Sequence, residues 1–274
     1  MSMVRVGDVN LYYESHGDGE PLLLINGYGQ YSAHWVTLIP VLSQEYRVIS
    51  FDNRGTGRSD KPDMPYTLKM MADDAKGLLD AIDVDAAHVF GISMGGMIAQ
   101  EFALNYPNKL ISLILGCTHC GGTNMLMPTQ EALAFLFGRE RAELTVEERA
   151  RQTVPWLWTE DFIDKNPEAI ELYVAITTKY PTPVHGYACQ ARAIAAHDTY
   201  EGLHGITAPT LVITGGADRL IPAENSRLLA SRVPNAELVI LDNAGHGFIA
   251  DGGVEAARVM LDFLSRHSRD KNKP

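Results

Sequence analysis

The feature that most constrains the fold is a Gly-x-Ser-x-Gly pattern at residues 91–95, because it lies between two different kinds of segment. The apolar run before it is typical of a buried strand, and residues 97–104 after it are compatible with a helix. A strand that turns directly into a helix strains its turn residue and needs small residues two positions before and after it. Gly91 and Gly95 meet this need. The pattern also arises by chance, but in this context it predicts that Ser93 is a nucleophile at the tip of the turn, above the positive end of a helix dipole.

Composition and charge narrow the class of protein. The chain has 274 residues, 46% of them hydrophobic, which suffices for the core of an α/β domain with an insertion. Its net charge of −11 argues against nucleic acid or an anionic membrane surface as partners, because both select for basic patches. No apolar run approaches the roughly 18 residues needed to cross a bilayer, and residues 1–8 lack the apolar core of a secretory signal. We expect a cytoplasmic monomer or homodimer that acts on a small molecule.

The cysteines favour free thiols. Cys117, Cys120 and Cys189 are an odd number and do not form a disulfide framework. Cys117 and Cys120 have the spacing of a metal-binding pair, but a zinc site needs two further ligands, and residues 121–124 supply none. We therefore expect no bound metal.

Strand-like and helix-like segments alternate along most of the chain, which predicts an α/β fold with a mostly parallel sheet and helices on both faces. In such sheets ligands bind beyond the carboxyl ends of the strands. The expected strands are a hairpin at residues 3–16, followed by residues 22–25, 46–51, 87–90, 110–115, 210–214 and 236–241. The expected helices span residues 34–42, 67–82, 97–104 and 254–267.

The alternation of strand-like and helix-like segments stops between residues 117 and 206, where only helical patterns separated by Pro and Gly occur. We therefore divide the chain into a core, residues 1–116 and 207–274, and a helical lid, residues 117–206. Apolar bulk such as Trp156 and Trp158 concentrates in the lid. The expected lid helices span residues 129–137, 146–153, 167–179 and 184–197.

The loop at residues 52–59 carries glycines, but it lacks the sequence of a phosphate-binding loop. We interpret it as a structural turn whose Asp and Arg side chains connect loops. Binding of an anionic substrate by this loop stays open as an alternative.

A serine nucleophile needs a base, and His246 is the best placed of the nine histidines. It follows the last strand, and the flanking Gly245 and Gly247 allow its ring to project into a cleft. A histidine that merely caps a helix is the alternative. His119, His185 and His197 fall within the lid and could contact substrate; the other histidines are interpreted as surface or structural.

The base needs a carboxylate to orient it, and Asp218 is the first acid after the strand at 210–214. Asp242 is closer to His246 in sequence but lies at a strand end, which makes it the weaker choice. The order Ser93, Asp218, His246 is that of nucleophile, acid and base in hydrolases of the α/β class.

Taken together, these motifs resemble the α/β-hydrolase superfamily from about residue 9 to residue 266, most closely its small lidded esterases and enol-lactonases of the 3-oxoadipate type. The resemblance implies an α/β-hydrolase fold with an eight-stranded sheet. The quoted motifs are Gly-Ile-Ser-Met-Gly-Gly, Asp-Asn-Arg-Gly-Thr-Gly-Arg-Ser, Gly-Gly-Ala-Asp-Arg-Leu-Ile-Pro and Ala-Gly-His-Gly.

The loop at residues 26–30 follows a buried strand, where acyl-transfer enzymes place the second donor of an oxyanion hole. A plain strand-to-helix turn is the alternative. The resemblance implies that the donors are the backbone N–H groups of Tyr28 and Met94. This chain has Asn26-Gly27 where the family usually has His-Gly, so the hydrogen bonds that hold the loop should differ.

These residues predict a serine hydrolase that transfers the acyl group of a small to medium, largely apolar ester or lactone to water, without a cofactor. Cleavage of C–C bonds and perhydrolysis use the same residues and stay open, as does a ligand receptor built on this fold. The residues expected to line the substrate pocket are Gly27, His119, Trp156, Trp158 and Phe248.

Overall fold

The computed structural model describes residues 2–137 and 143–269, and it contains the predicted eight-stranded, mostly parallel sheet. The strand order is β1-β2-β4-β3-β5-β6-β7-β8. Pairings β1–β2 and β2–β4 are antiparallel, and all later neighbours are parallel. The strands are β1 (Ser2–Val6), β2 (Val9–His16), β3 (Glu20–Ile25), β4 (Tyr46–Phe51), β5 (Ala87–Ile92), β6 (Leu110–Gly116), β7 (Thr210–Gly215) and β8 (Glu237–Leu241).

Helices cover both faces of the sheet, because the central strands are apolar on both sides. In β3, Leu23 and Ile25 pack with α2, α3 and α9, whereas Leu22 and Leu24 face the opposite layer, which includes α1 and α11. The continuous apolar run at the end of β3 is therefore explained by burial on two faces. The covering helices are α1 (Ile39–Leu42), α2 (Leu68–Ala81), α3 (Met94–Asn105), α9 (Glu224–Arg232), α10 (Phe248–Asp251) and α11 (Gly253–Arg266).

The helix expected at residues 34–42 is divided in two. A 3-10 helix, η1, covers Ser32–Trp35, and α1 begins only at Ile39. Pro40 stands in the first turn of α1. Because proline lacks an N–H, it suits the start of a helix and not its interior.

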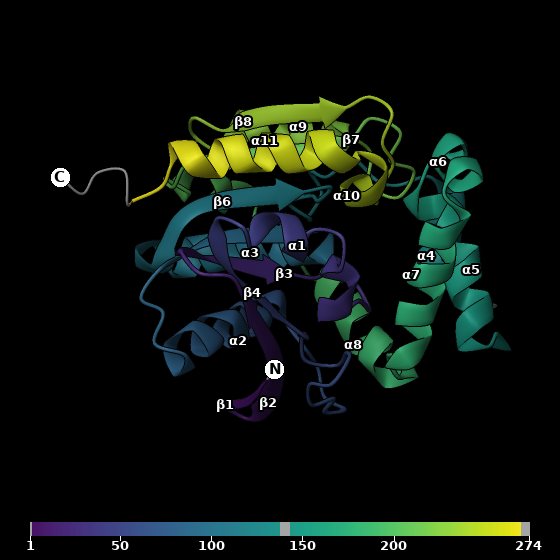
Figure 1. Cartoon of the computed structure of the whole chain (residues 1–274), viewed down its shortest axis with the longest axis horizontal. Helices are drawn as coiled ribbons and strands as arrows, with labels where there is room; N and C mark the ends of the chain where they lie inside the picture. The colour runs from purple at the N-terminus through teal and green to yellow at the C-terminus, as the bar shows by residue number, and fades with distance from the viewer. Residues whose placement is uncertain (1, 138–142, 270–274) are drawn as a thin grey trace.

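Among the described residues between β6 and β7 are the α-helices α4–α8, which lie beyond the carboxyl ends of the strands (Figure 1). We call α4–α8 the inserted helices. Two details differ from the sequence prediction: α5 extends past Pro155, which lies in its last turn, and α6 was not expected. The inserted helices are α4 (Gln130–Phe137), α5 (Val146–Leu157), α6 (Glu160–Lys165), α7 (Pro167–Lys179) and α8 (Val184–Ala195).

Within the described residues, no helix has the length and apolarity that a membrane crossing requires.

Two histidines are buried where the inserted segment meets the core. His119 and His197 are 6% and 4% exposed, with ring centroids 6.4 Å apart. Burial lowers the pKa of His119 to about 4, and burial together with the neighbouring His119 lowers the pKa of His197 to about 3. Both rings are therefore neutral in the folded protein near pH 7.

We predict acid destabilisation from this pair. A histidine in the unfolded chain has a pKa near 6.5. As the pH falls below 6.5, the unfolded state therefore binds protons that the folded state binds only near pH 4 at His119 and near pH 3 at His197. Each histidine should lower the free energy of unfolding by about 1.4 kcal/mol per pH unit in that window and contribute no slope above it. Urea unfolding of wild type and His119→Gln between pH 7.5 and 4.5 measures this effect. Below pH 6.5, the free energy of unfolding of the variant should depend on pH less steeply than that of wild type, by the equivalent of about one proton. Equal slopes in the two proteins would show that His119 is not held neutral by the fold.

Candidate active site

Ser93 adopts the strained turn that the sequence pattern predicts. Its backbone has φ 56° and ψ −122°, a region that non-glycine residues rarely occupy. A Cβ on Gly91 would lie 2.1 Å from the Gly95 carbonyl oxygen, and one on Gly95 would lie 2.1 Å from that of Ile25. The two glycines are therefore required by the close crossing of β5, β3 and α3.

Two hydrogen bonds from β6 and the loop after it hold the turn. The Ser93 N–H donates to the Gly116 carbonyl at 2.8 Å, and the Thr118 hydroxyl donates to the Ser93 carbonyl at 2.8 Å. Helix α3 begins at Met94, so the N–H of that residue has no acceptor within the helix. Sequence reasoning missed Thr118, because its role depends on the pairing of β5 with β6.

His246 and Asp218 meet as predicted, from loops that follow β8 and β7. The His246 Nδ1 donates to Asp218 Oδ2 at 2.7 Å. Asp218 Oδ1 accepts the backbone N–H groups of Leu220 and Ile221 at 2.8 and 2.9 Å, which fixes the carboxylate. Burial alone lowers the pKa of His246, but attraction to the Asp218 carboxylate outweighs burial and raises the pKa well above its usual value. By contrast, Asp242 is exposed at the surface.

The Cys117 thiol lies beside the other imidazole nitrogen of His246. Its Sγ lies 3.9 Å from His246 Nε2, and its S–H donates to the His246 carbonyl at 3.3 Å. Cys117, Asp218 and His246 together bring metal-type ligand atoms within 4.8 Å of one another. Metal ligation needs a thiolate, whereas burial raises the pKa of Cys117 and its proton is donated to a carbonyl. The thiol therefore fits a role in holding the His246 loop.

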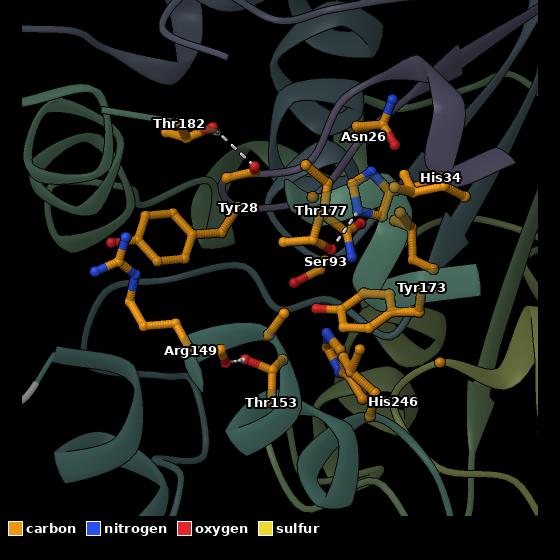
Figure 2. Close-up of a pocket in the computed structure, with 18 of the residues that line it drawn as sticks. Asn26, Tyr28, His34, Ser93, Arg149, Thr153, Tyr173, Thr177, Thr182 and His246 are labelled. Atoms are coloured by element: carbon orange, nitrogen blue, oxygen red, sulfur yellow. Dashed lines mark hydrogen bonds between the residues drawn. The ribbon is translucent and has the colours of Figure 1, made fainter. Parts of the chain in front are cut away.

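One large cavity, of about 690 Å³, contains both Ser93 and His246 (Figure 2). The core supplies Gly27, Tyr28 and these two side chains, and the inserted helices supply most of the apolar wall. Two of the five residues expected in the pocket, Gly27 and Trp158, line it. Further lining residues, which the sequence did not single out, include Phe135, Leu136, Ala150, Leu157, Leu172, Tyr173, Ile176 and Tyr187.

The other three residues expected in the pocket, His119, Trp156 and Phe248, do not line this cavity. His119 is buried against His197, and its Nδ1 accepts the Gly121 N–H at 3.0 Å. Phe248, the first residue of α10, is fully buried in the core layer that contains α11. Trp156 stacks on Phe135 and lines a separate hollow of about 280 Å³. In each case the sequence showed the residue type but not the direction of its side chain.

Helix α8 and the residues just before it hold the loop at residues 26–30. On α8, Gln190 Oε1 accepts the Gly29 N–H at 2.9 Å. Before the helix begins, the Thr182 hydroxyl donates to the Gly29 carbonyl at 3.0 Å (Figure 2). The Tyr28 hydroxyl donates to the Tyr187 carbonyl at 3.2 Å. Gly29 has φ +69°, and a Cβ there would lie 2.2 Å from the Tyr187 ring. The backbone of the loop is thus set by residues about 160 positions away, which local sequence cannot reveal.

The inserted helices also hold the His246 loop. The Gly247 N–H donates to the Leu157 carbonyl at 2.7 Å, and the Trp158 indole N–H donates to the Gly247 carbonyl at 3.2 Å. Gly245 donates to Asp251 Oδ2 at 2.7 Å. Both loops that border the nucleophile therefore depend on contacts with the insertion.

The loop at residues 52–59 has the structural role that the sequence favoured. Asp52 accepts the backbone N–H groups of Ser32 and Arg58 at 2.8 and 2.7 Å. Arg54 is 2% exposed and paired with Asp74. Neither Arg54 nor Arg58 lines the large cavity, so this loop presents no guanidinium to the space beside Ser93.

Comparisons with known proteins agree with this arrangement. The family described as the alpha/beta hydrolase fold matches residues 20–252. A poly(3-hydroxyalkanoate) depolymerase of Ectopseudomonas oleovorans is 32% identical over 90% of this chain and 84% of its own length. A protein of Azorhizobium caulinodans named as a carbamate hydrolase is 32% identical over 91% of this chain and 93% of its own.

A solved structure extends the likeness to the whole fold. The enol-lactonase from Burkholderia xenovorans LB400 superposes with a TM-score of 0.85 at 25% identity, over 96% of this chain and 100% of its own. Fold, motif order and family match point to the same conclusion: the chain belongs to the α/β-hydrolase family.

Proposed function

We propose that this chain is a serine hydrolase that cleaves a small to medium ester or lactone through an acyl-enzyme on Ser93. One observation carries the proposal: the strained Ser93 shares a cavity with His246, whose far nitrogen is bound to the fixed Asp218 carboxylate. Such a chain of hydroxyl, imidazole and carboxylate is what an unactivated serine needs to attack a carbonyl.

In the proposed reaction, the Ser93 Oγ attacks the carbonyl carbon while His246 Nε2 takes its proton. Asp218 holds Nδ1 protonated and stabilises the imidazolium that forms. His246 then gives its proton to the leaving alkoxide. Water, deprotonated by the same nitrogen, next attacks the acyl-enzyme and releases the carboxylic acid and free Ser93.

The negative oxygen of each tetrahedral intermediate needs donors that are already in place. The backbone N–H groups of Met94 and Tyr28 are our candidates, since both residues adjoin Ser93 or the cavity. Such a donor typically contributes on the order of 10²–10³-fold to the rate. The hydrogen bonds from Gln190 and Thr182 to Gly29 would keep the Tyr28 donor in position.

We further propose that residues 117–206 act as a lid over this core. The inserted helices supply most of the apolar wall of the cavity, which suits a substrate with a sizeable apolar part. The enol-lactonase among the structural relatives supports a lactone or ester as the substrate class.

Turnover of 4-nitrophenyl butyrate tests the proposal. The purified protein should hydrolyse many equivalents, and Ser93→Ala should lower kcat/KM by at least about 10³-fold. Hydrolysis that persists unchanged in the folded variant would show that Ser93 is not the nucleophile. A single slow turnover with retained product would instead indicate a ligand receptor built on this fold.

A further inference from the structure

The side-chain amide of Gln30 stands out among the polar groups around the cavity. Other polar side chains of the cavity wall are bonded to the protein: the Tyr28 hydroxyl donates to the Tyr187 carbonyl, and the Thr182 hydroxyl donates to the Gly29 carbonyl. Gln30 also lines the cavity, but within residues 2–137 and 143–269 its amide has no hydrogen-bonding partner. An amide carries two N–H donors and a carbonyl acceptor, so all of these are open to a ligand.

A turn brings the Gln30 side chain next to the proposed nucleophile. The Gln30 backbone N–H donates to the Gly27 carbonyl at 3.2 Å, which closes a turn over residues 27–30. A Cβ on Gly27 would lie 3.3 Å from Ser93 Cβ and 3.6 Å from Gln30 Oε1. Both side chains therefore border the space that Gly27 leaves empty. Gln30 Oε1 is thus within a few bond lengths of the place where a scissile carbonyl must lie.

The wall that carries Gln30 is polar but uncharged. Residues 26–37 contain no Asp, Glu, Lys or Arg. His34 shares a hydrogen bond with the Thr177 hydroxyl through Nε2, at 3.2 Å (Figure 2). Burial lowers the pKa of His34 to about 4, so its ring is neutral near pH 7. A neutral polar group of the ligand therefore suits this wall, because a charged group would lack a counter-ion there.

We propose that the site takes an ester or lactone with a hydroxyl group close to its scissile carbonyl, and that Gln30 binds this hydroxyl. The inference rests on the proposed function and names its substrate class. The Gln30 atom beside Ser93 is a carbonyl oxygen, which needs a donor from the ligand.

The chemistry of the wall selects a hydroxyl over other polar groups. A carboxylate or a second ester group has no donor to give to Gln30 Oε1. An ammonium group has donors, but no Asp or Glu is among the described residues that line the cavity. A hydroxyl supplies the donor without a charge. An ester that lacks it would leave the Gln30 amide desolvated and unpaired, which is the basis of discrimination by polar sites.

Paired substrates test the proposal and distinguish a hydroxyl on the acyl side from one on the alcohol side. In each pair a methyl group replaces the hydroxyl and keeps the shape. The acyl pair is 4-nitrophenyl 3-hydroxypropionate and 4-nitrophenyl butyrate, and the alcohol pair is 2-hydroxyethyl butyrate and propyl butyrate. In at least one pair, kcat/KM of wild type should be higher for the hydroxy ester than for its methyl partner. Gln30→Met should lower this ratio about tenfold, equivalent to about 1.4 kcal/mol.

Gln44→Met is the matched control, because it makes the same substitution at an exposed glutamine outside the cavity. It should keep the wild-type ratio. If Gln30→Met lowered kcat/KM equally for both members of each pair, Gln30 would only support the loop at residues 26–30, and the proposal would be overturned. A wild-type preference for the methyl ester in both pairs would overturn it as well.

A binding measurement separates this proposal from the proposed function. Calorimetric titration of Ser93→Ala needs no turnover; the ligands are ethyl 3-hydroxypropionate against ethyl butyrate, and 2-hydroxyethyl butyrate against propyl butyrate. Tighter binding of a hydroxy ester, lost when Gln30→Met is added, supports the hydroxyl site even if Ser93 is not the nucleophile. Equal affinities within both pairs would contradict it.

Discussion

Replacing Asp218 by asparagine is expected to lower kcat by about 10⁴-fold while the protein stays folded. The carboxylate accepts the Nδ1 proton of His246 at 2.7 Å and is held by two backbone N–H groups. An asparagine amide in the same place can present its NH₂ group to Nδ1, which moves the ring proton to Nε2, where the nucleophile needs a free base. The loss should therefore fall on the chemical step and not on substrate binding. Steady-state hydrolysis of 4-nitrophenyl butyrate measures it.

Asp242→Asn is the matched control. Asp242 stands four residues before His246 but is exposed, so its replacement should leave kcat within about threefold of wild type. NMR titration of His246 adds an independent readout, because the pKa that Asp218 raises should fall in Asp218→Asn and remain in Asp242→Asn. If Asp242→Asn proved the damaging change, the orienting acid would have been misassigned.

Gln190→Met is expected to lower kcat by about 10²-fold with little change in KM, which is the size of effect that follows the loss of an oxyanion donor. Gln190 is fully buried on α8. Its Oε1 accepts the Gly29 N–H at 2.9 Å, and its Nε2 donates to the Arg54 carbonyl at 3.1 Å. Methionine fills the same volume without either bond, so the Tyr28 N–H would lose its fixed direction.

Gln190→Glu distinguishes positioning from general damage. A protonated glutamic acid offers both the acceptor for Gly29 and the donor for Arg54, so activity should recover relative to Gln190→Met. The melting temperatures of both variants establish that the protein is folded. A folded Gln190→Met protein with wild-type kcat would show that α8 does not set the oxyanion loop.

Much of the core of the site is predictable from the sequence, because it depends on short patterns with strict local geometry. Gly91 and Gly95 mark the turn at Ser93, since any side chain there would collide with backbone. Asp218 and His246 are recognisable because each follows a predicted strand, and parallel strands end at one edge of a sheet.

The wall of the cavity is not predictable in the same way. Whether a residue of an inserted helix faces the cavity depends on how that helix docks, which no local pattern encodes. Trp158, the extended residue that follows α5, lines the cavity. Trp156, in the last turn of α5, stacks instead on Phe135. The contacts of Gln190 and Thr182 with Gly29 are not predictable for a related reason, because Gly29 lies about 150 to 160 residues earlier in the chain.

The nucleophile itself admits the most direct test. We would incubate the protein with diethyl 4-nitrophenyl phosphate, an organophosphate ester that leaves a stable group on an activated serine, then digest it and locate the added mass by mass spectrometry. We predict one diethylphosphoryl group, on Ser93, with esterase activity lost in proportion to labelling and no labelling of Asp218→Asn on the same timescale. A label on Cys117, or activity that survives complete labelling of Ser93, would contradict this prediction.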